Sequence, residues 1–392
     1  MANLLCIYEN KIATVATLEN FFKGLYKYNS VYSFKSCKIS RVTNNDIEWC
    51  DVLCLVRPNH PSFAKVAKLA KNHGICVIFF LDDDLLHLPK EHADMRWRRK
   101  GLKQAAYYSD IVVSSSPYIC DSYGRIANTK RRIVIDTAVS KQDIKQHLPH
   151  KGRIKLVYAA GLAHKKMFDQ FILPILVNLD NKYGDQISLS FMGVHPDLNM
   201  QDYKMPIYYI DSLPLAEYRK RIEDENFDIG LAPLITNDFT KCKYFNKFIE
   251  YAMFGIVGIY SRTEPYTFVV RDRENGLLCD NNPDDWFNAL SIAIENKDLI
   301  ENCRVESYLT LERRFDEETI SKNFLCEISE LSVPHCKRKV WELQIPLIKL
   351  GYCLSRVGDW IYKSVFYLKI GGIKELISSI KRHYRVAKIV RS

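Results

Sequence analysis

The residues best placed to do chemistry lie on a predicted helix over about 241–254. Lys243, Lys247 and Glu250 fall within about 40° of one line on that helix, at roughly 100° per residue. Ammonium groups near a helix start attract phosphate, and a carboxylate one turn later accepts hydrogen bonds from ribose hydroxyls. This pattern suits a nucleoside diphosphate. The alternative, when the helix is considered alone, is a solvated face on which Lys247 and Glu250 form an ion pair at i and i+3.

Two apolar runs flank this helix and must position it. The run 229–234 predicts a buried strand before the helix, and the run 256–260 predicts another strand after Gly255, the expected helix C-cap. Strand, helix and strand in this order form the crossover unit of a parallel sheet. The apolar side of the helix should then cover the sheet through Phe245, Phe248, Ile249 and Ala252.

Three segments of this part of the chain carry a family resemblance. DIGLAPL, FNKFIEYAMFGI and ENGLLCDNNPDDWFNAL together resemble the donor-sugar domain of GT-B glycosyltransferases, most closely the retaining family-four enzymes (glycosyl transferases group 1). The resemblance implies that Glu250, in EYAMFG, holds the ribose of the donor. Family members usually carry a second glutamate eight residues earlier, where this chain has Cys242. Lys243, beside it, is then expected to supply phosphate contacts instead.

The chain before this region alternates short buried strands with helices, such as 61–72 and 93–107, which predicts a doubly wound parallel sheet. The resemblance covers roughly residues 1–330. It implies an α/β protein of the GT-B fold, with two Rossmann-like doubly wound domains facing a cleft. We expect an acceptor domain over 1–150, a linker near 141–153 and a donor domain over 151–333, whose last helix crosses back to the first domain.

Two polar groups follow predicted strands of the first domain, where open α/β sheets place their ligands. They are the segments 57–60, RPNH, and 82–84, DDD. Clustered carboxylates suit a hard divalent cation, but three adjacent ones rarely converge on one ion, and capping the next segment is an equally simple role. The resemblance implies no metal. It points to an acceptor-side catalytic role for Asp82 or Asp83, with a structural cap as the alternative.

Two further strand ends supply the remaining candidates. The turn GLAHKK, 161–166, joins a strand to a helix, and its small residues allow a ligand close to the backbone. In the resembled family this loop contacts the donor diphosphate, so His164 is a catalytic candidate and Lys165 and Lys166 are donor-binding candidates. An exposed basic helix start is the alternative for either lysine. Glu264, after another strand, is expected to face the same cleft.

Composition limits the other classes of function. The 392 residues are 47% hydrophobic and 26% charged, which is ordinary for a globular protein with two cores. The 12 cysteines form no CxxC pair, so we expect reduced, buried thiols. The N-terminus does not resemble a secretory signal, and no apolar run reaches the roughly 18 residues of a membrane span. A cytoplasmic protein is therefore expected.

The segment 334–392 differs in charge from the rest. It holds 13 Lys and Arg residues against three Asp and Glu residues, so the whole net charge of +10 lies there. Residues 1–333 therefore carry no net charge, which argues against nucleic-acid binding by this part of the chain. The tail mixes aromatic and aliphatic residues with Lys and Arg, and glycines at 351, 358, 371 and 372 should divide it into short helices. This predicts an amphipathic tail lying on an anionic membrane surface; closure of a domain by the apolar residues is the alternative.

Together these features predict a metal-independent hexosyltransferase of surface polysaccharide synthesis, peripheral on the inner face of the membrane. It would move a sugar with retention from a nucleotide sugar, most simply a UDP-sugar, to a glycan or lipid-linked acceptor, without a cofactor. A polyol-phosphate transferase with a cytidine donor and a catalytically silent GT-B subunit remain open. The sequence does not specify the sugar, base, acceptor, linkage or oligomeric state.

Overall fold

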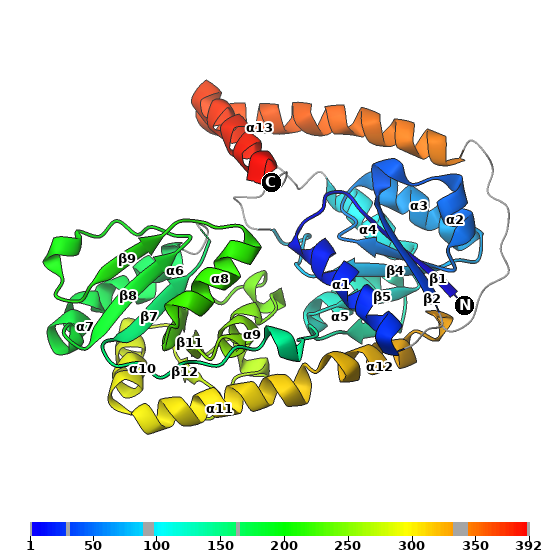
Figure 1. Cartoon of the computed structure of the whole chain (residues 1–392). Coiled ribbons are helices and arrows are strands. Elements are labelled where there is room, and N and C mark those ends of the chain that lie inside the picture. The colour runs from blue at the N-terminus through cyan, green and yellow to red at the C-terminus, as the bar shows by residue number, and fades with distance from the viewer. Residues whose placement is uncertain (1, 29–31, 89–97, 162–164, 332–343, 390–392) are drawn as a thin grey trace. The chain divides into compact units, whose positions relative to one another are not determined.

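The computed structural model describes residues 2–28, 32–88, 98–161, 165–331 and 344–389 (Figure 1). The chain divides into two compact units, Met1–Thr137 with Glu318–Ser392, and Ala138–Glu317. The segment 138–150, which the sequence assigned to the first domain, belongs to the second unit, and the chain returns to the first unit at Glu318. The predicted helix over 93–107 begins at Arg99 in the described residues, and 93–97 lie outside them.

The first unit is built on a six-stranded parallel sheet. Its four central strands are short apolar runs whose residues are mostly buried on both faces, as expected for a sheet covered by helices. The spatial order is β2-β1-β3-β4-β5-β6, so the order reverses between β1 and β3. The strands are β1 (Ala2–Tyr8), β2 (Tyr32–Lys38), β3 (Val52–Val56), β4 (Cys76–Leu81), β5 (Ile111–Ser114) and β6 (Arg132–Val134).

Helices connect these strands and close the unit. The returning α12 (Glu317–Glu327) brings Phe324 edge-on against Phe21 of α1, with ring centroids 5.2 Å apart. The segment 61–72 forms a helix as predicted, and Pro61 stands at its first turn, where a missing N–H costs nothing. The connecting helices are α1 (Ala13–Tyr28), α2 (Asn44–Trp49), α3 (Pro61–Asn72), α4 (Arg99–Tyr107) and α5 (Pro117–Ala127).

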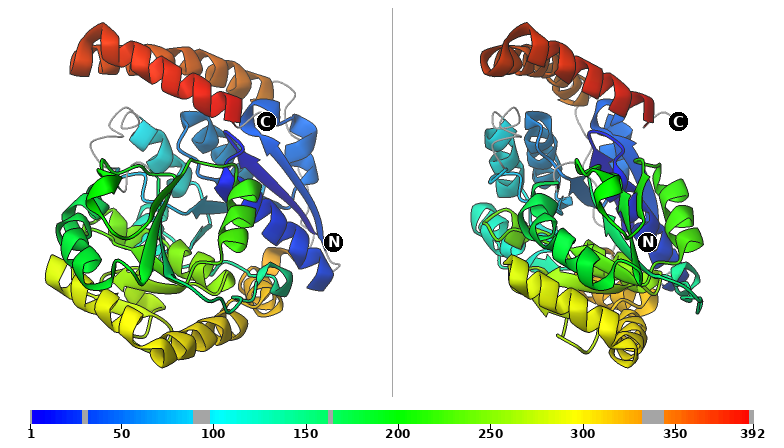
Figure 2. Two further views of the ribbon diagram at one scale, coloured as in Figure 1. Left: turned by 60° about the vertical axis from the view of Figure 1, so that its left-hand side comes forward. Right: turned by 90° about the vertical axis from the view of Figure 1, so that its left-hand side faces the viewer.

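The second unit holds another six-stranded parallel sheet, which confirms the predicted pair of doubly wound sheets (Figures 1 and 2). The order is β12-β11-β10-β7-β8-β9, with the reversal between β7 and β10. The strands are β7 (Ile154–Ala159), β8 (Ile187–Met192), β9 (Ile207–Ile210), β10 (Ile229–Ala232), β11 (Val257–Ser261) and β12 (Leu277–Cys279).

Two helices of this unit differ from the prediction. The single helix expected after the turn 161–166 is broken into α6 (Lys165–Phe171) and α7 (Leu176–Tyr183), because Pro174 lies in the 3₁₀ turn between them. The helix expected over 241–254 begins only at Asn246, as α9 (Asn246–Met253). The others are α8 (Leu215–Glu225), α10 (Pro283–Glu295) and α11 (Lys297–Arg314).

The tail forms α13 (Gln344–Ile389), which belongs to the first unit. The predicted division at Gly351 and Gly358 is wrong, since the helix continues through both. Only Gly371 and Gly372 leave helical geometry, and the chain bends sharply there (Figures 1 and 2). The tail residues before 344 lie outside the described part. In the ranges that the structure describes, no helix combines the length and apolarity needed to cross a membrane.

Candidate active site

A cavity of about 310 Å³ lies at the carboxyl edge of the second sheet, where the strand order reverses. Parallel α/β sheets bind ligands at this point because the connections on its two sides lead away in opposite directions. The ends of β7, β8 and β10 form its floor, and α8 and α9 supply polar side chains. The lining comprises residues 158–161, 192–193, 211–213 and 231–233, with Tyr218, Lys247, Glu250 and Tyr266.

Lys247 and Glu250 line this cavity together, as their spacing on the helix predicted. The Lys247 Nζ lies 2.5 Å from the Glu250 Oε2, and the two side chains are 28% and 22% exposed. The same ammonium lies 3.4 Å from the Tyr218 hydroxyl. The pair is thus partly desolvated, and it differs from the freely solvated ion pair that the sequence allowed.

Tyrosines surround the Glu250 carboxylate. Burial, followed by the negative charge of Glu250, raises the pKa of both Tyr218 and Tyr266. The same two causes, with neighbouring tyrosines, hold the pKa of Tyr251 well above its usual value. These phenols therefore stay protonated, and those in the cavity wall can donate hydrogen bonds. Tyr266 belongs to the strand-end segment that the sequence predicted to face the cleft with Glu264, whereas no sequence pattern indicated Tyr218.

Lys243 does not share the helix line of Lys247 and Glu250. It precedes α9 with an extended backbone, and its Nζ lies 5.1 Å from the ring centroid of Phe239. The prediction failed because the 3₁₀ turn 240–242 takes up the residues that were expected to begin the helix. Cys242, at the position of the missing glutamate, is 4% exposed, and its thiol donates to the Asp238 carbonyl.

The remaining donor-side candidates among the described residues lie beside residues that line the cavity and not in its lining. Gly161, two residues after the end of β7, lines the cavity, and Lys165 and Lys166 begin α6. His164 lies outside the described residues. Glu264 is half-buried after β11, two residues before Tyr266, which does line the cavity.

The first unit has a corresponding cavity of about 370 Å³ where its own strand order reverses. Glu9 and Asn10 after β1 and Arg57 after β3 line it, together with Trp360 and Lys363 of α13. Seven further residues complete the wall: Ile12, Val15, Val56, Asn59, Arg98, Arg356 and Asp359.

A buried ion network forms one side of this first cavity. Arg98 is 4% exposed and contacts Glu9 at 2.5 Å and Asp359 of α13 at 2.6 Å. Arg356 adds a second contact to Glu9 at 2.8 Å. Sequence reasoning missed this network, because its members come from three distant segments and none belongs to a motif.

Asp82 and Asp83 follow β4 at the same edge, next to Arg57. The Arg57 guanidinium lies 3.2 Å from Asp82 and 3.3 Å from Asp83, so the two polar groups singled out after separate strands meet. Burial raises the pKa of Asp82, although Arg57 acts in the opposite direction. Asp84 turns elsewhere: it accepts from the Leu86 amide and the Tyr123 hydroxyl. Asp82 and Asp83 thus share Arg57, whereas Asp84 has other partners.

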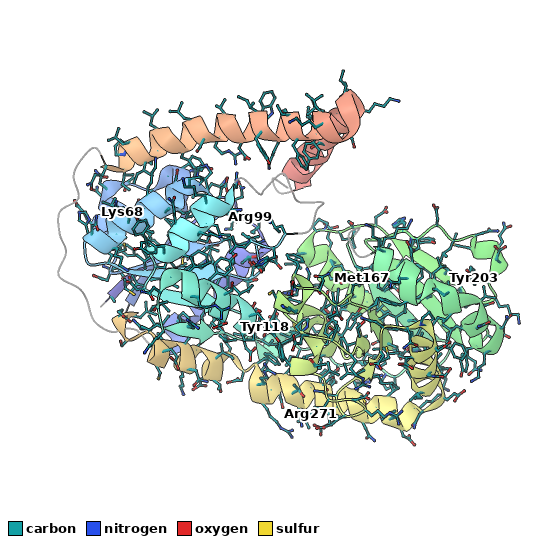
Figure 3. The ribbon with its side chains drawn as sticks, turned by 180° about the vertical axis from the view of Figure 1, so that it is seen from behind. Lys68, Arg99, Tyr118, Met167, Tyr203 and Arg271 are labelled. Carbon is teal, nitrogen blue, oxygen red and sulfur yellow. The ribbon has the colours of Figure 1, made fainter. Side chains whose placement is uncertain are left out.

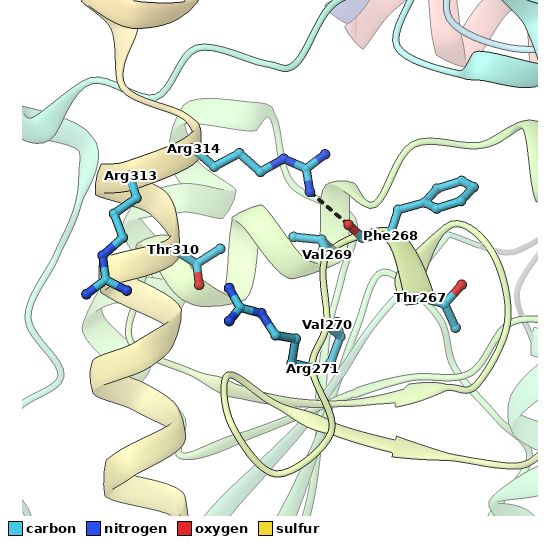
Figure 4. Close-up of a pocket in the computed structure, with 8 residues that line it drawn as sticks. All are labelled: Thr267, Phe268, Val269, Val270, Arg271, Thr310, Arg313 and Arg314. Carbon is cyan, nitrogen blue, oxygen red and sulfur yellow. Dashed lines mark hydrogen bonds between the residues drawn. The ribbon is translucent and has the colours of Figure 1, made fainter.

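A third cavity, of about 190 Å³, lies between the segment 267–271 and α11 (Figure 4). Arg313 and Arg314 leave α11 in different directions, and Arg314 donates to the Phe268 carbonyl at 2.8 Å. Arg271 pairs with Glu274. Its arginines therefore have partners within the protein, and none of the described candidate residues lines it.

No family model matches the chain, and no curated protein matches it. Its fold resembles many solved structures at low identity. Anabaena HepE in complex with UDP and glucose has 12% identity and a TM-score of 0.58, covering 84% of this chain and 100% of that one. Sucrose-phosphate synthase from Thermosynechococcus elongatus has 12% identity and a TM-score of 0.61, covering 84% and 99%. The lipopolysaccharide outer core galactosyltransferase WaaB has 13% identity and a TM-score of 0.57, covering 84% and 99%. The chain has the GT-B fold, as the resemblance implied.

Proposed function

We propose that the protein is a glycosyltransferase that takes its sugar from a nucleotide donor bound at the carboxyl edge of the second sheet. The observation that carries the proposal is the cavity at the strand reversal, which presents Lys247, Glu250 and two neutral tyrosines together. HepE, of the same fold, has been solved with UDP-glucose. A UDP-sugar is therefore the donor we put first.

Each part of such a donor has a suitable partner in this cavity. The Glu250 carboxylate can accept from ribose hydroxyls once Lys247 turns toward the diphosphate, and charge-assisted bonds of this kind are strong. Gly193 at the end of β8 has φ +80°, and a side chain there would meet the Ala160 carbonyl. Only glycine therefore fits at this point of the floor. Fixed cations and amides would stabilise the leaving diphosphate without a metal, and Lys165 and Lys166 are the nearest further cations along the chain.

The test is a thermal-shift and calorimetric panel of UDP-, GDP- and CDP-activated compounds with the full-length protein. A UDP-sugar or GDP-sugar that raises the melting temperature supports the enzyme, and the anomeric configuration of its product reports retention. A preference for CDP-polyols would replace the proposal with a polyol-phosphate transferase. No response to any donor would favour a catalytically silent subunit.

We also propose that α13 lies on an anionic membrane surface and presents a lipid-linked acceptor. One side of the helix packs on the first unit, where Ile345 is buried and Ser355 contacts His60. Side chains project from the side that faces away from that unit (Figure 3). Exposed apolar residues recur there within about 60° of one line: Leu347, Leu350, Leu354, Ile361, Val365 and Leu368. The net charge of the tail selects an anionic surface over a neutral partner.

Vesicle flotation of a double variant, Leu354→Asp with Ile361→Asp, tests this surface without removing the helix. Both side chains are more than half exposed, so the fold should survive. Each buried leucine-sized side chain contributes about 1.5–3 kcal/mol, so binding to anionic vesicles should fall at least about tenfold. Val305→Asp, at an exposed apolar position on α11, is the matched control. Equal flotation of the double variant and wild type would exclude the membrane.

A further inference from the structure

Two histidines and an aspartate meet at the amino edge of the second sheet, opposite the donor cavity. His147 and His150 lie in the segment before β7, and Asp228 directly precedes β10. Since β7 and β10 are parallel neighbours, their amino ends are adjacent. Asp228 stands about 13 Å of strand away from the carboxyl edge, so the group goes beyond the proposed glycosyl transfer.

The spacing of the three side chains is that of a metal-ligand set. The His147 Nε2 lies 3.1 Å from one carboxylate oxygen of Asp228, and the His150 Nε2 lies 3.0 Å from the other. The three ligand atoms all lie within 4.8 Å of one another. Zinc–ligand bonds near 2.0–2.1 Å place tetrahedral ligand atoms about 3.3 Å apart. Small side-chain movements would therefore bring all three atoms onto one ion.

The His147 ring points to a ligand more specifically. Its side chain is 7% exposed, and its Nε2 forms no hydrogen bond of good geometry although the Asp228 oxygen is near. A buried ring nitrogen of this kind is uncommon, because desolvation without a bond costs free energy. A metal ion between the nitrogen and the carboxylate would give the nitrogen a partner.

The surroundings hold the three residues in place. The Lys155 amide donates to the Asp228 carboxylate at 2.8 Å and fixes its orientation. The Tyr308 hydroxyl accepts from the His147 amide, and Asn226 makes two hydrogen bonds with the Leu148 backbone. Such supporting bonds are what metal sites use to orient their ligands.

We propose that His147, His150 and Asp228 bind one zinc ion, with water as the fourth ligand, and thereby pin the segment 138–150 to the second sheet. Two imidazoles with one carboxylate suit a borderline transition metal better than magnesium or calcium, which prefer oxygen ligands. The His150 side chain, 25% exposed, leaves a path for the ion and its water. The ion is structural, because it lies at the edge of the sheet away from Lys247 and Glu250.

The test uses the full-length protein, purified without a histidine tag, stripped with chelator and titrated with zinc. We expect one zinc ion per chain, a higher melting temperature with zinc than with magnesium, and tetrahedral absorption bands with cobalt. His150→Ala, at the more exposed ligand, should lower zinc affinity at least about tenfold, and Asp228→Asn should do the same while keeping an acceptor for the Lys155 amide.

The matched control is His195→Ala, which removes an exposed histidine that pairs with Asp211 in the same unit but, among the described residues, belongs to no group of three ligands. This variant should bind zinc as wild type does. Wild-type protein that binds no zinc, or His150→Ala with unchanged affinity, would overturn the site. Zinc affinity does not require a nucleotide sugar, so failure here leaves the donor proposal standing, and failure of the donor panel leaves the zinc site standing.

Discussion

In each unit a cavity lies where the strand order reverses, between β1 and β3 in the first sheet and between β7 and β10 in the second. The first cavity is bordered by charges that already form a network, with Arg98 between Glu9 and Asp359. In the second, Lys247 pairs with Glu250 among tyrosines. The same position in two similar sheets therefore carries different electrostatics.

The difference indicates what each set of charges does. The side chains of Glu9 and Asp359 are 9% and 7% exposed, and their contacts with Arg98 connect α13 to the unit, so separating them would leave buried charges without compensation. The Lys247–Glu250 pair is partly exposed and joins residues of a single helix, so a ligand can replace either partner at little structural cost. One network is structural, and the other pair is available for binding.

The largest effect is expected from Arg98→Met, which keeps the side-chain length but leaves Glu9 and Asp359 buried without this cation. Breaking a buried pair in this way costs about 3–5 kcal/mol. Urea unfolding should show that loss in the free energy of unfolding. Arg125→Met, which removes an exposed pair with Asp121 in the same unit, should cost at most about 1 kcal/mol. Equal losses in the two variants would show that the network is not structural.

Glu250→Ala should instead leave stability nearly unchanged and weaken donor binding. Loss of a charge-assisted bond to ribose corresponds to about 1.5–3 kcal/mol, measured by calorimetry with the preferred nucleotide sugar. Glu312→Ala, at an exposed position on α11 of the same unit, is the control. A folded Glu250→Ala protein with wild-type affinity would remove Glu250 from the donor site and erase the contrast between the two cavities.

The smallest effect is expected from brief chelation. Neither cavity needs a metal in the proposed reaction, so the initial transfer rate should stay within about twofold, well below the 1.4 kcal/mol that a tenfold change requires. The melting temperature should fall at the same time, because the proposed zinc ion is structural. Loss of turnover that magnesium or manganese restores would instead require Asp82 and Asp83 to be reassigned as metal ligands.

The sequence predicted the sheets well because buried parallel strands are continuous apolar runs, such as 52–56 and 76–81. It also placed Lys247 and Glu250 together, since residues three apart on a helix share a face. Local spacing was misleading at Lys243, where a 3₁₀ turn precedes the helix. Helix starts are set by such turns, which periodicity does not detect.

Contacts between distant segments were beyond the sequence. Arg98 meets a residue 261 positions later, and Asp228 meets histidines about 80 positions earlier. Neither set forms a motif, and both depend on the order in which strands lie side by side. The role of His60 was likewise not visible in the sequence. Its side chain caps α3 and contacts Ser355 of α13, and burial lowers its pKa to about 4. This histidine is therefore structural.

The attachment of α13 also bears on how the protein would search for an acceptor. Three polar contacts, Arg98 with Asp359, Arg356 with Glu9 and His60 with Ser355, fix the first half of the helix to its unit. A helix held in this way is a rigid mount and not a flexible tether. On a bilayer it would fix the tilt of the first unit relative to the membrane plane. The protein would then search for a lipid-linked acceptor in two dimensions, with the orientation of the first unit already set. The entropic cost of aligning that unit would arise once, when α13 binds the bilayer.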